Sequence, residues 1–260
     1  MKQWNGLLQK EWIQWRWQLL ILAILMVTGL FVLPTFAGVI AADAITVFEI
    51  TMVVCFMAAA FGSLVPVISF VIMFNREMKR PDLWLHSTAT TTTLVGAKMT
   101  MAAFIGAGSL IIPTAVVAIR YAFMQPTVTT FEELLFFGSV FIGFLFLGSI
   151  MYMVVGFFFI VLDQMFKRFV KGFSIVITLI LFILSIRVYG EVISSSIYKR
   201  VSQFGKIDFM AIKNPTIEIE YGYFAYTDTI VYTGELMSAA LFAVALFLAG
   251  VTLIDKQVKL

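Results

Sequence analysis

Residues 134–162 read LLFFGSVFIGFLFLGSIMYMVVGFFFIVL, and this stretch contains no Asp, Glu, Lys, Arg or His. An α-helix needs about 20 consecutive apolar residues to cross the hydrocarbon core of a bilayer. The stretch exceeds that length without one ionisable side chain. It therefore predicts a membrane-spanning helix.

Five further stretches also lack ionisable side chains. They are residues 19–40, 50–74, 99–119, 173–186 and 236–253. The sequence as a whole is 61% hydrophobic and 13% charged, and its charged fraction is about half that of a soluble domain. We predict an all-α integral membrane protein whose six transmembrane helices form a single domain over residues 1–260. The fifth stretch is short, and it either continues through residues 188–193 or enters the bilayer only partway.

Basic residues are distributed unevenly between the segments that join these stretches. The N-terminal segment, residues 75–98, residues 163–171 and the C-terminal tail hold twelve of the 18 lysines and arginines but only five of the 15 acidic residues. Cytoplasmic segments carry the excess of lysine and arginine. We therefore expect a multi-pass protein of the plasma membrane with both termini in the cytoplasm. The net charge of +3 reflects this asymmetry and does not indicate nucleic-acid binding.

The first 17 residues combine tryptophans with basic and polar residues at helical spacing. Such a pattern is typical of an amphipathic helix that lies in the membrane interface. We expect this interfacial helix over residues 1–17; the alternative is a basic, aromatic border on the first span. The two differ in whether the chain turns sharply near residue 17. The expected interfacial anchors are Trp4, Trp12, Trp15 and Trp17.

Residues 187–234 form a long connection between the fifth and sixth stretches. Their apolar residues are first spaced as in short amphipathic helices, then Pro215 interrupts the pattern, and an aromatic group follows over residues 221–232. We expect an extracytoplasmic helical hairpin, either re-entrant or lying on the surface, with an aromatic belt.

The connection over residues 75–98 reads NREMKRPDLWLHSTATTTTLVGAK. A charged stretch leads to Leu85-His86-Ser87, and Gly96-Ala97-Lys98 opens the third span. This order resembles the cytoplasmic loop of the ABC-2 type permeases, the membrane subunits of ATP-driven exporters. A proline often found just after the serine is missing, since Thr88 and Ala89 stand there. As architecture, the resemblance covers the whole chain: an N-terminal elbow helix, six spans, both ends inside and a long external hairpin.

The resemblance implies that Pro81–Thr93 forms a coupling helix that docks into a groove of a cytoplasmic ATP-binding subunit. It also implies a second permease copy, either in a homodimer or as a sister permease, within the lipid bilayer. ATP and magnesium would lie on the partner subunit, with no cofactor in this chain. The residues expected to couple to the ATPase are Pro81, Asp82, Leu83, Trp84, Leu85, His86, Ser87 and Thr88.

Several kinds of site are missing from the sequence. No Gly-x-x-x-x-Gly-Lys-Ser/Thr motif is present, so we expect no ATP site and no enzymatic activity in this chain. The only cysteine, Cys55, and the only histidine, His86, allow neither a disulfide nor a histidine-pair metal site. Residues 90–93 are four threonines that suggest helix capping. The pair Glu132 and Glu133 is expected to be solvated.

Three classes of function fit these features. The first is the permease subunit of an ATP-driven exporter that forms the path for a hydrophobic or amphipathic substrate, such as a peptide. Size and phenylalanine-rich spans resemble the Gram-positive exporters of phenol-soluble modulins; export of drugs, lipids or polymers is the alternative. The second class is a secondary transporter or passive hydrophobic channel, although the charge-free spans disfavour ion coupling. The third is an intramembrane enzyme, which needs polar groups at membrane depth.

Overall fold

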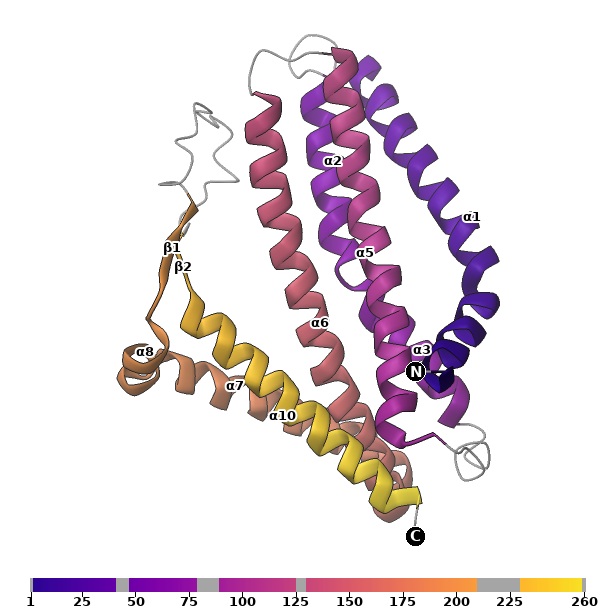
Figure 1. Cartoon of the computed structure of the whole chain (residues 1–260), viewed down its shortest axis with the longest axis vertical. Helices are drawn as coiled ribbons and strands as arrows, with labels where there is room; N and C mark the ends of the chain where they lie inside the picture. Colours follow the sequence, from indigo (N-terminus) through magenta and orange to yellow (C-terminus); the bar gives the residue numbers. More distant parts are fainter. Residues whose placement is uncertain (1, 41–46, 79–88, 125–129, 210–229, 259–260) are drawn as a thin grey trace. The chain divides into compact units, whose positions relative to one another are not determined.

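A computed structural model describes residues 2–40, 47–78, 89–124, 130–209 and 230–258, and these are almost entirely α-helical (Figure 1). Long apolar helices dominate because each satisfies its backbone hydrogen bonds internally, as a bilayer requires. The elements are α1 (Lys2–Ile40), α2 (Val47–Gly62), α3 (Val65–Met78), α5 (Thr91–Met124), α6 (Phe131–Val170), the 3₁₀ turn η1 (Lys171–Phe173), α7 (Ser174–Ser194), α8 (Ser196–Ser202), β1 (Lys206–Asp208), β2 (Ile230–Tyr232) and α10 (Thr233–Val258).

Five helical stretches of the described chain are long and apolar enough to cross a membrane. The chain is therefore an all-α, multi-pass membrane protein. One of the five stretches, Phe131–Ser194, runs through α6, η1 and α7. The expected count of six separate spans is accordingly not confirmed. The five stretches are Gln3–Val39, Val47–Met78, Thr91–Met124, Phe131–Ser194 and Thr233–Lys256.

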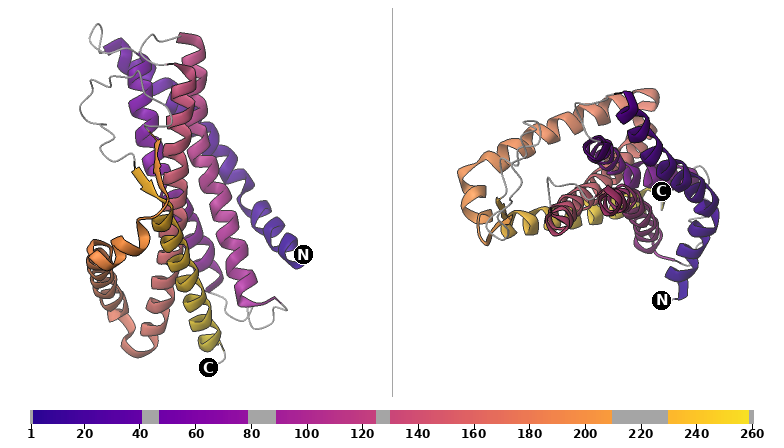
Figure 2. Two further views of the ribbon diagram at one scale, coloured as in Figure 1. Left: turned by 60° about the vertical axis from the view of Figure 1, so that its left-hand side comes forward. Right: turned by 90° about the horizontal axis from the view of Figure 1, so that it is seen from above.

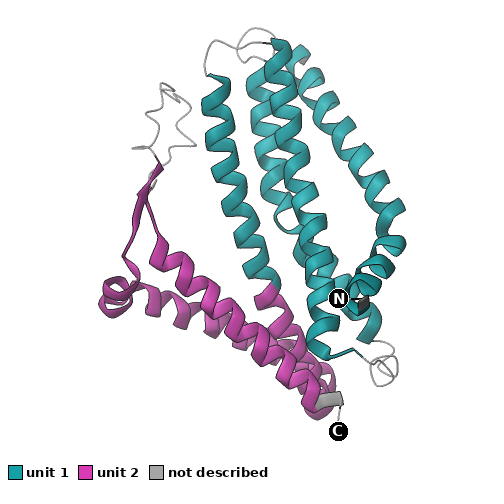
Figure 3. Cartoon of the chain, in the orientation of Figure 1, with its two compact units in different colours: residues 1–153 teal, residues 154–260 magenta. Residues whose placement is uncertain are grey.

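The chain divides into two compact units, Met1–Met153 and Val154–Leu260, shown in two colours in Figure 3. In the first unit, α5 is the central helix and α1, α2 and α3 all pack against it (Figure 2). Small residues on α5 allow this crowding. Close packing of this kind drives helix association in a bilayer. Lipid tails are as apolar as the side chains, so moving apolar surface from lipid into a helix contact gains little free energy.

Helix α1 is continuous from Lys2 to Ile40. The separate elbow helix expected over residues 1–17 is therefore not confirmed, because no break in the helix occurs near Trp17. Another expectation was wrong: residues 163–170 form the last turns of α6, not a loop. Their helix is stabilised by an ion pair between Lys167 and Asp163 at 2.7 Å. The same Asp163 accepts a hydrogen bond of 2.8 Å from the Ser174 hydroxyl, which opens α7.

Pro66 creates a tight joint between α3 and α5. Proline has no N–H to donate, so the carbonyl of Gly62, four residues earlier, loses its helical partner. The Ser109 hydroxyl of α5 lies 3.0 Å from this carbonyl and 2.7 Å from the Gly106 carbonyl of its own helix, so its single proton is shared between the two. Gly106 lies beside the proline ring, and a Cβ there would come within 2.0 Å of the ring carbon Cγ of Pro66. Gly106 thus lets α5 approach the proline, and Ser109 offers the Gly62 carbonyl a donor that it shares with its own helix.

Replacing Ser109 by alanine should destabilise this joint by about 1–2 kcal/mol, because the buried Gly62 carbonyl would lose its interhelical donor. The measurement is the thermal unfolding midpoint of the detergent-purified chain. Ser149→Ala is the matched control, since that buried hydroxyl donates only to the Phe146 carbonyl of its own helix. Equal midpoints for the two variants would contradict the assignment.

In the second unit, α7 continues without a break to Ser194. The helix of the fifth apolar stretch therefore includes residues 188–193, and whether it crosses the bilayer or enters only partway stays a prediction. The expected helical hairpin over residues 187–234 is not confirmed. Its described part contains the end of α7, the short helix α8 and an antiparallel pair of strands in which Ile207 faces Val231. Most of the expected aromatic belt lies outside the described residues.

Candidate coupling site and apolar groove

The eight residues expected to couple to an ATPase, Pro81 to Thr88, lie outside the described residues. Two described helices flank this part of the chain, since α3 ends at Met78 and α5 begins at Thr91. Thr90 caps α5: its hydroxyl oxygen accepts a hydrogen bond of 3.3 Å from the backbone N–H of Thr93. This confirms the capping predicted from the threonine run.

A buried ionic cluster ties these two helices to the N-terminal part of α1. The ammonium of Lys98 on α5 lies 2.5 Å from a carboxylate oxygen of Glu11 on α1 and 3.0 Å from one of Glu77 on α3. Lys10 adds a second cation at 2.9 Å from the same Glu77 oxygen. We call Lys10, Glu11, Glu77 and Lys98 the Lys98 cluster. It joins three helices at the flanks of residues 79–88.

Burial makes Lys98 the central member of the cluster. Its side chain is 4% exposed and that of Glu11 is 6% exposed, whereas Lys10 is 48% exposed. A charge withdrawn from water to this degree is retained only when an opposite charge or hydrogen bonds compensate its desolvation. The two acids and Lys98 therefore depend on one another, and a movement of one helix is resisted by the other two.

Helix α1 also contacts α5 through an aromatic ring next to the Lys98 cluster. A Cβ at Gly96 would come within 3.0 Å of the Trp4 indole, so the ring lies directly against the glycine backbone. Trp15 is half-buried, while Trp12 and Trp17 are 55% and 64% exposed. Exposed tryptophans suit a membrane interface, and the anchoring role of these four residues stays a prediction.

Sequence reasoning missed that these charges are buried. Ordinary cytoplasmic charges were expected at Glu11, Glu77 and Lys98. Only Lys98 stood out, because it ends the Gly-Ala-Lys motif. Arg120 of α5 is buried as well: it is 9% exposed and donates to the Phe31 carbonyl at 2.6 Å. Glu133, expected to be solvated, is 4% exposed.

The burial of Glu133 has a local cause. Its carboxylate accepts a hydrogen bond from the Thr130 N–H at 3.2 Å, and its own N–H donates to the Thr130 hydroxyl at 3.4 Å. This reciprocal pair is a capping box at the start of α6. The spacing Thr-x-x-Glu was the signal that could have revealed it.

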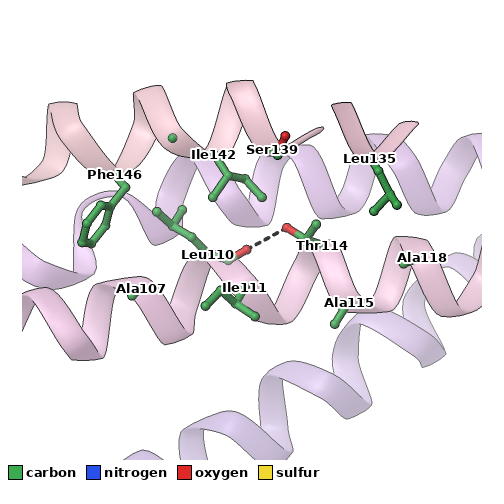
Figure 4. A pocket seen from close by; sticks show the side chains of 11 residues that line it. Ala107, Leu110, Ile111, Thr114, Ala115, Ala118, Leu135, Ser139, Ile142 and Phe146 are labelled. Atoms are coloured by element: carbon green, nitrogen blue, oxygen red, sulfur yellow. Dashed lines mark hydrogen bonds between the residues drawn. The ribbon is translucent and has the colours of Figure 1, made fainter. Parts of the chain in front are cut away.

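An apolar groove of about 550 Å³ lies between α5 and the first half of α6 (Figure 4). None of the residues lining it is charged. Its hydroxyl groups, on Thr114 and Ser139, already donate to the carbonyls of Leu110 and Phe136 within their own helices. The groove therefore favours apolar chains or side chains over ions or sugars. Its lining residues are Ala107, Leu110, Ile111, Thr114, Ala115, Ala118, Leu135, Ser139, Ile142, Gly143 and Phe146.

Within the described ranges, no three His, Cys, Asp or Glu side chains lie together in a way that would bind a metal ion. Cys55 is a free thiol buried against Leu30 and Val116. Comparison with family models, curated proteins and solved structures finds no match for this chain. The case for a function therefore depends on the resemblance of its loop and on the geometry of the Lys98 cluster and the groove.

Proposed function

We propose that this chain is the permease subunit of an ATP-driven exporter of the ABC-2 type, with both termini in the cytoplasm. The observation that carries the proposal is the Lys98 cluster. It connects both helices that flank residues 79–88 to the N-terminal part of α1 through buried charges. A cytoplasmic subunit that moved the intervening segment would act on three helices together.

In this proposal ATP and magnesium bind the partner subunit, and this chain supplies the path. Docking of residues 81–88 transmits closure of the ATPase pair to α3 and α5. The Lys98 cluster passes the displacement on to α1, since a buried ion pair resists separation in a low dielectric. Two permease copies, identical or sister subunits, enclose the path between them.

The substrate class follows from the apolar groove. Its uncharged lining and its already engaged hydroxyls suit a hydrophobic or amphipathic substrate, and we propose a peptide. Binding such a chain depends on buried apolar area and requires few polar contacts. A substrate with a charged body would lose its hydration there without compensation.

The test is to express this chain with the ATPase encoded beside its gene, purify the pair and measure vanadate-sensitive ATP hydrolysis in proteoliposomes. We expect a stable complex whose hydrolysis is raised by amphipathic peptides. A chain that binds no ATPase and conducts apolar solutes without ATP would favour the passive channel. A complex whose ATP hydrolysis is stimulated by lipids or drugs but by no peptide would support the exporter and contradict a peptide substrate.

Substituting Leu85 by aspartate should abolish stimulated ATP hydrolysis while leaving membrane insertion intact. A charge placed at an apolar anchor of a docking ridge loses its hydration on binding and costs several kcal/mol, enough to dissociate the subunits. Trp84→Ala should weaken the complex in the same direction. The measurements are the amount of ATPase co-purified per permease and the vanadate-sensitive rate.

Trp12→Ala is the matched control for Trp84→Ala, because Trp12 is an exposed tryptophan of α1 outside the segment. It should leave ATPase binding unchanged. Normal complex formation by both Trp84→Ala and Leu85→Asp would refute the placement of the coupling residues.

A further inference from the structure

The second unit contains an open cavity of about 550 Å³ between α7, α8 and α10, and wall residues such as Leu184 and Val188 are more than half exposed. One face of α7 provides an aliphatic wall, because Leu181, Leu184, Val188 and Val192 recur at helical spacing along it. This wall extends over about 16 Å at 1.5 Å per residue. Its remaining lining residues are Ser185, Tyr189, Tyr198, Ser238 and Phe242.

Polar groups gather at one end of this cavity. The Tyr198 hydroxyl lies 2.7 Å from the Ser238 hydroxyl, which joins α8 to α10. The Tyr189 ring stacks on Phe242 at a centroid distance of 5.5 Å. No described residue accepts a hydrogen bond from the Tyr189 hydroxyl, so this hydroxyl remains available to a ligand. The cavity is thus aliphatic along its length and polar at its α8 end.

Two cations follow Tyr198 directly on α8. Lys199 and Arg200 are exposed, and neither forms an ion pair with a described residue. Neighbouring cations of this unit are paired with acids: Arg187 with Glu191 at 3.6 Å, and Lys206 with Asp208 at 3.9 Å. Neither cation lines the cavity, but both lie on α8 within two residues of Tyr198, whose side chain does.

We propose that this cavity binds one molecule of an anionic phospholipid. An acyl chain lies along the aliphatic wall of α7 and makes van der Waals contact with it over about 16 Å. The phosphate contacts Lys199 and Arg200 and accepts a hydrogen bond from Tyr189, because basic groups beside membrane helices bind anionic headgroups. The site is separate from the transport proposal and does not depend on it.

The test is native mass spectrometry of the full-length chain, delipidated in detergent and then mixed with phosphatidylglycerol or phosphatidylcholine. We expect one phosphatidylglycerol to be retained per chain in preference to phosphatidylcholine. The double variant Lys199→Gln/Arg200→Gln should weaken phosphatidylglycerol binding by about tenfold or more. Lys171→Gln/Lys256→Gln, which removes the same charge at the ends of α7 and α10 far from α8, should bind as the wild type does.

A second pair of variants tests the acyl chain. Leu184→Trp fills the cavity and should lower phosphatidylglycerol retention, whereas Leu179→Trp, on the same helix outside the lining, should not. Size-exclusion profiles check that all variants remain folded. Equal retention of the two lipids by the wild type overturns the proposal. So does a Leu184→Trp variant that binds phosphatidylglycerol normally, because binding would then involve surface charge alone.

Discussion

Replacing Lys98 by methionine is expected to destabilise the first unit by about 3–5 kcal/mol, the cost of removing one partner from a buried ion pair. Glu11 would lose its ammonium partner at 2.5 Å and Glu77 the one at 3.0 Å, while Lys10 would still pair with Glu77 at 2.9 Å. For a chain of this size, we expect the thermal unfolding midpoint to fall by about 10 °C. The measurement is thermal unfolding of the detergent-purified variant followed by fluorescence-detected size exclusion.

Two variants distinguish a buried cluster from an ordinary surface contact. Lys10→Met removes a cation that is 48% exposed and should cost about 1 kcal/mol or less. The double variant Glu11→Gln/Lys98→Met removes opposite charges together and should recover part of the lost stability, because a smaller unpaired charge stays buried. If Lys98→Met unfolds at the same temperature as Lys10→Met, the cluster does not hold the three helices together.

Replacing Gly106 by alanine is expected to push α5 away from Pro66 and to destabilise the first unit by about 2 kcal/mol or more. The added Cβ would lie 2.0 Å from Cγ and 2.9 Å from Cδ of the proline. The proline ring is rigid and has no alternative rotamer that would make room. The Ser109 bond to the Gly62 carbonyl would lengthen as the helices separate. Thermal unfolding and the yield of monodisperse protein measure the effect.

Gly108→Ala is the matched control for this substitution. It places the same methyl group on the same helix two residues later, where no heavy atom lies within 4 Å. Alanine favours helix over glycine, so stability should stay equal or rise by up to about 1 kcal/mol. The double variant Pro66→Ala/Gly106→Ala should recover part of the loss, since it removes the ring carbons. Equal effects at positions 106 and 108 would contradict the close approach.

The elements that sequence predicted well are those set by long runs of one residue class. Uncharged stretches such as residues 134–162 predicted membrane helices because helix length and hydrocarbon thickness are directly related. The capping role of Thr90 was also readable, because it involves residues three positions apart. The exact ends of helices were not readable: residues 163–170 carry charges typical of a loop, yet they are helical and contain an i,i+4 ion pair between Asp163 and Lys167.

Sequence alone determined that this chain belongs in a membrane, because the hydrophobicity of its long stretches does not depend on which helices meet. Only tertiary structure decided which charges are buried. Glu11, Glu77 and Lys98 are far apart in sequence, and their pairing depends on three helices converging. The same holds for Gly106 against Pro66, because a close approach is a property of two surfaces. Composition thus determines that the chain lies in a bilayer, whereas the packing of its helices determines which of its charged groups are buried.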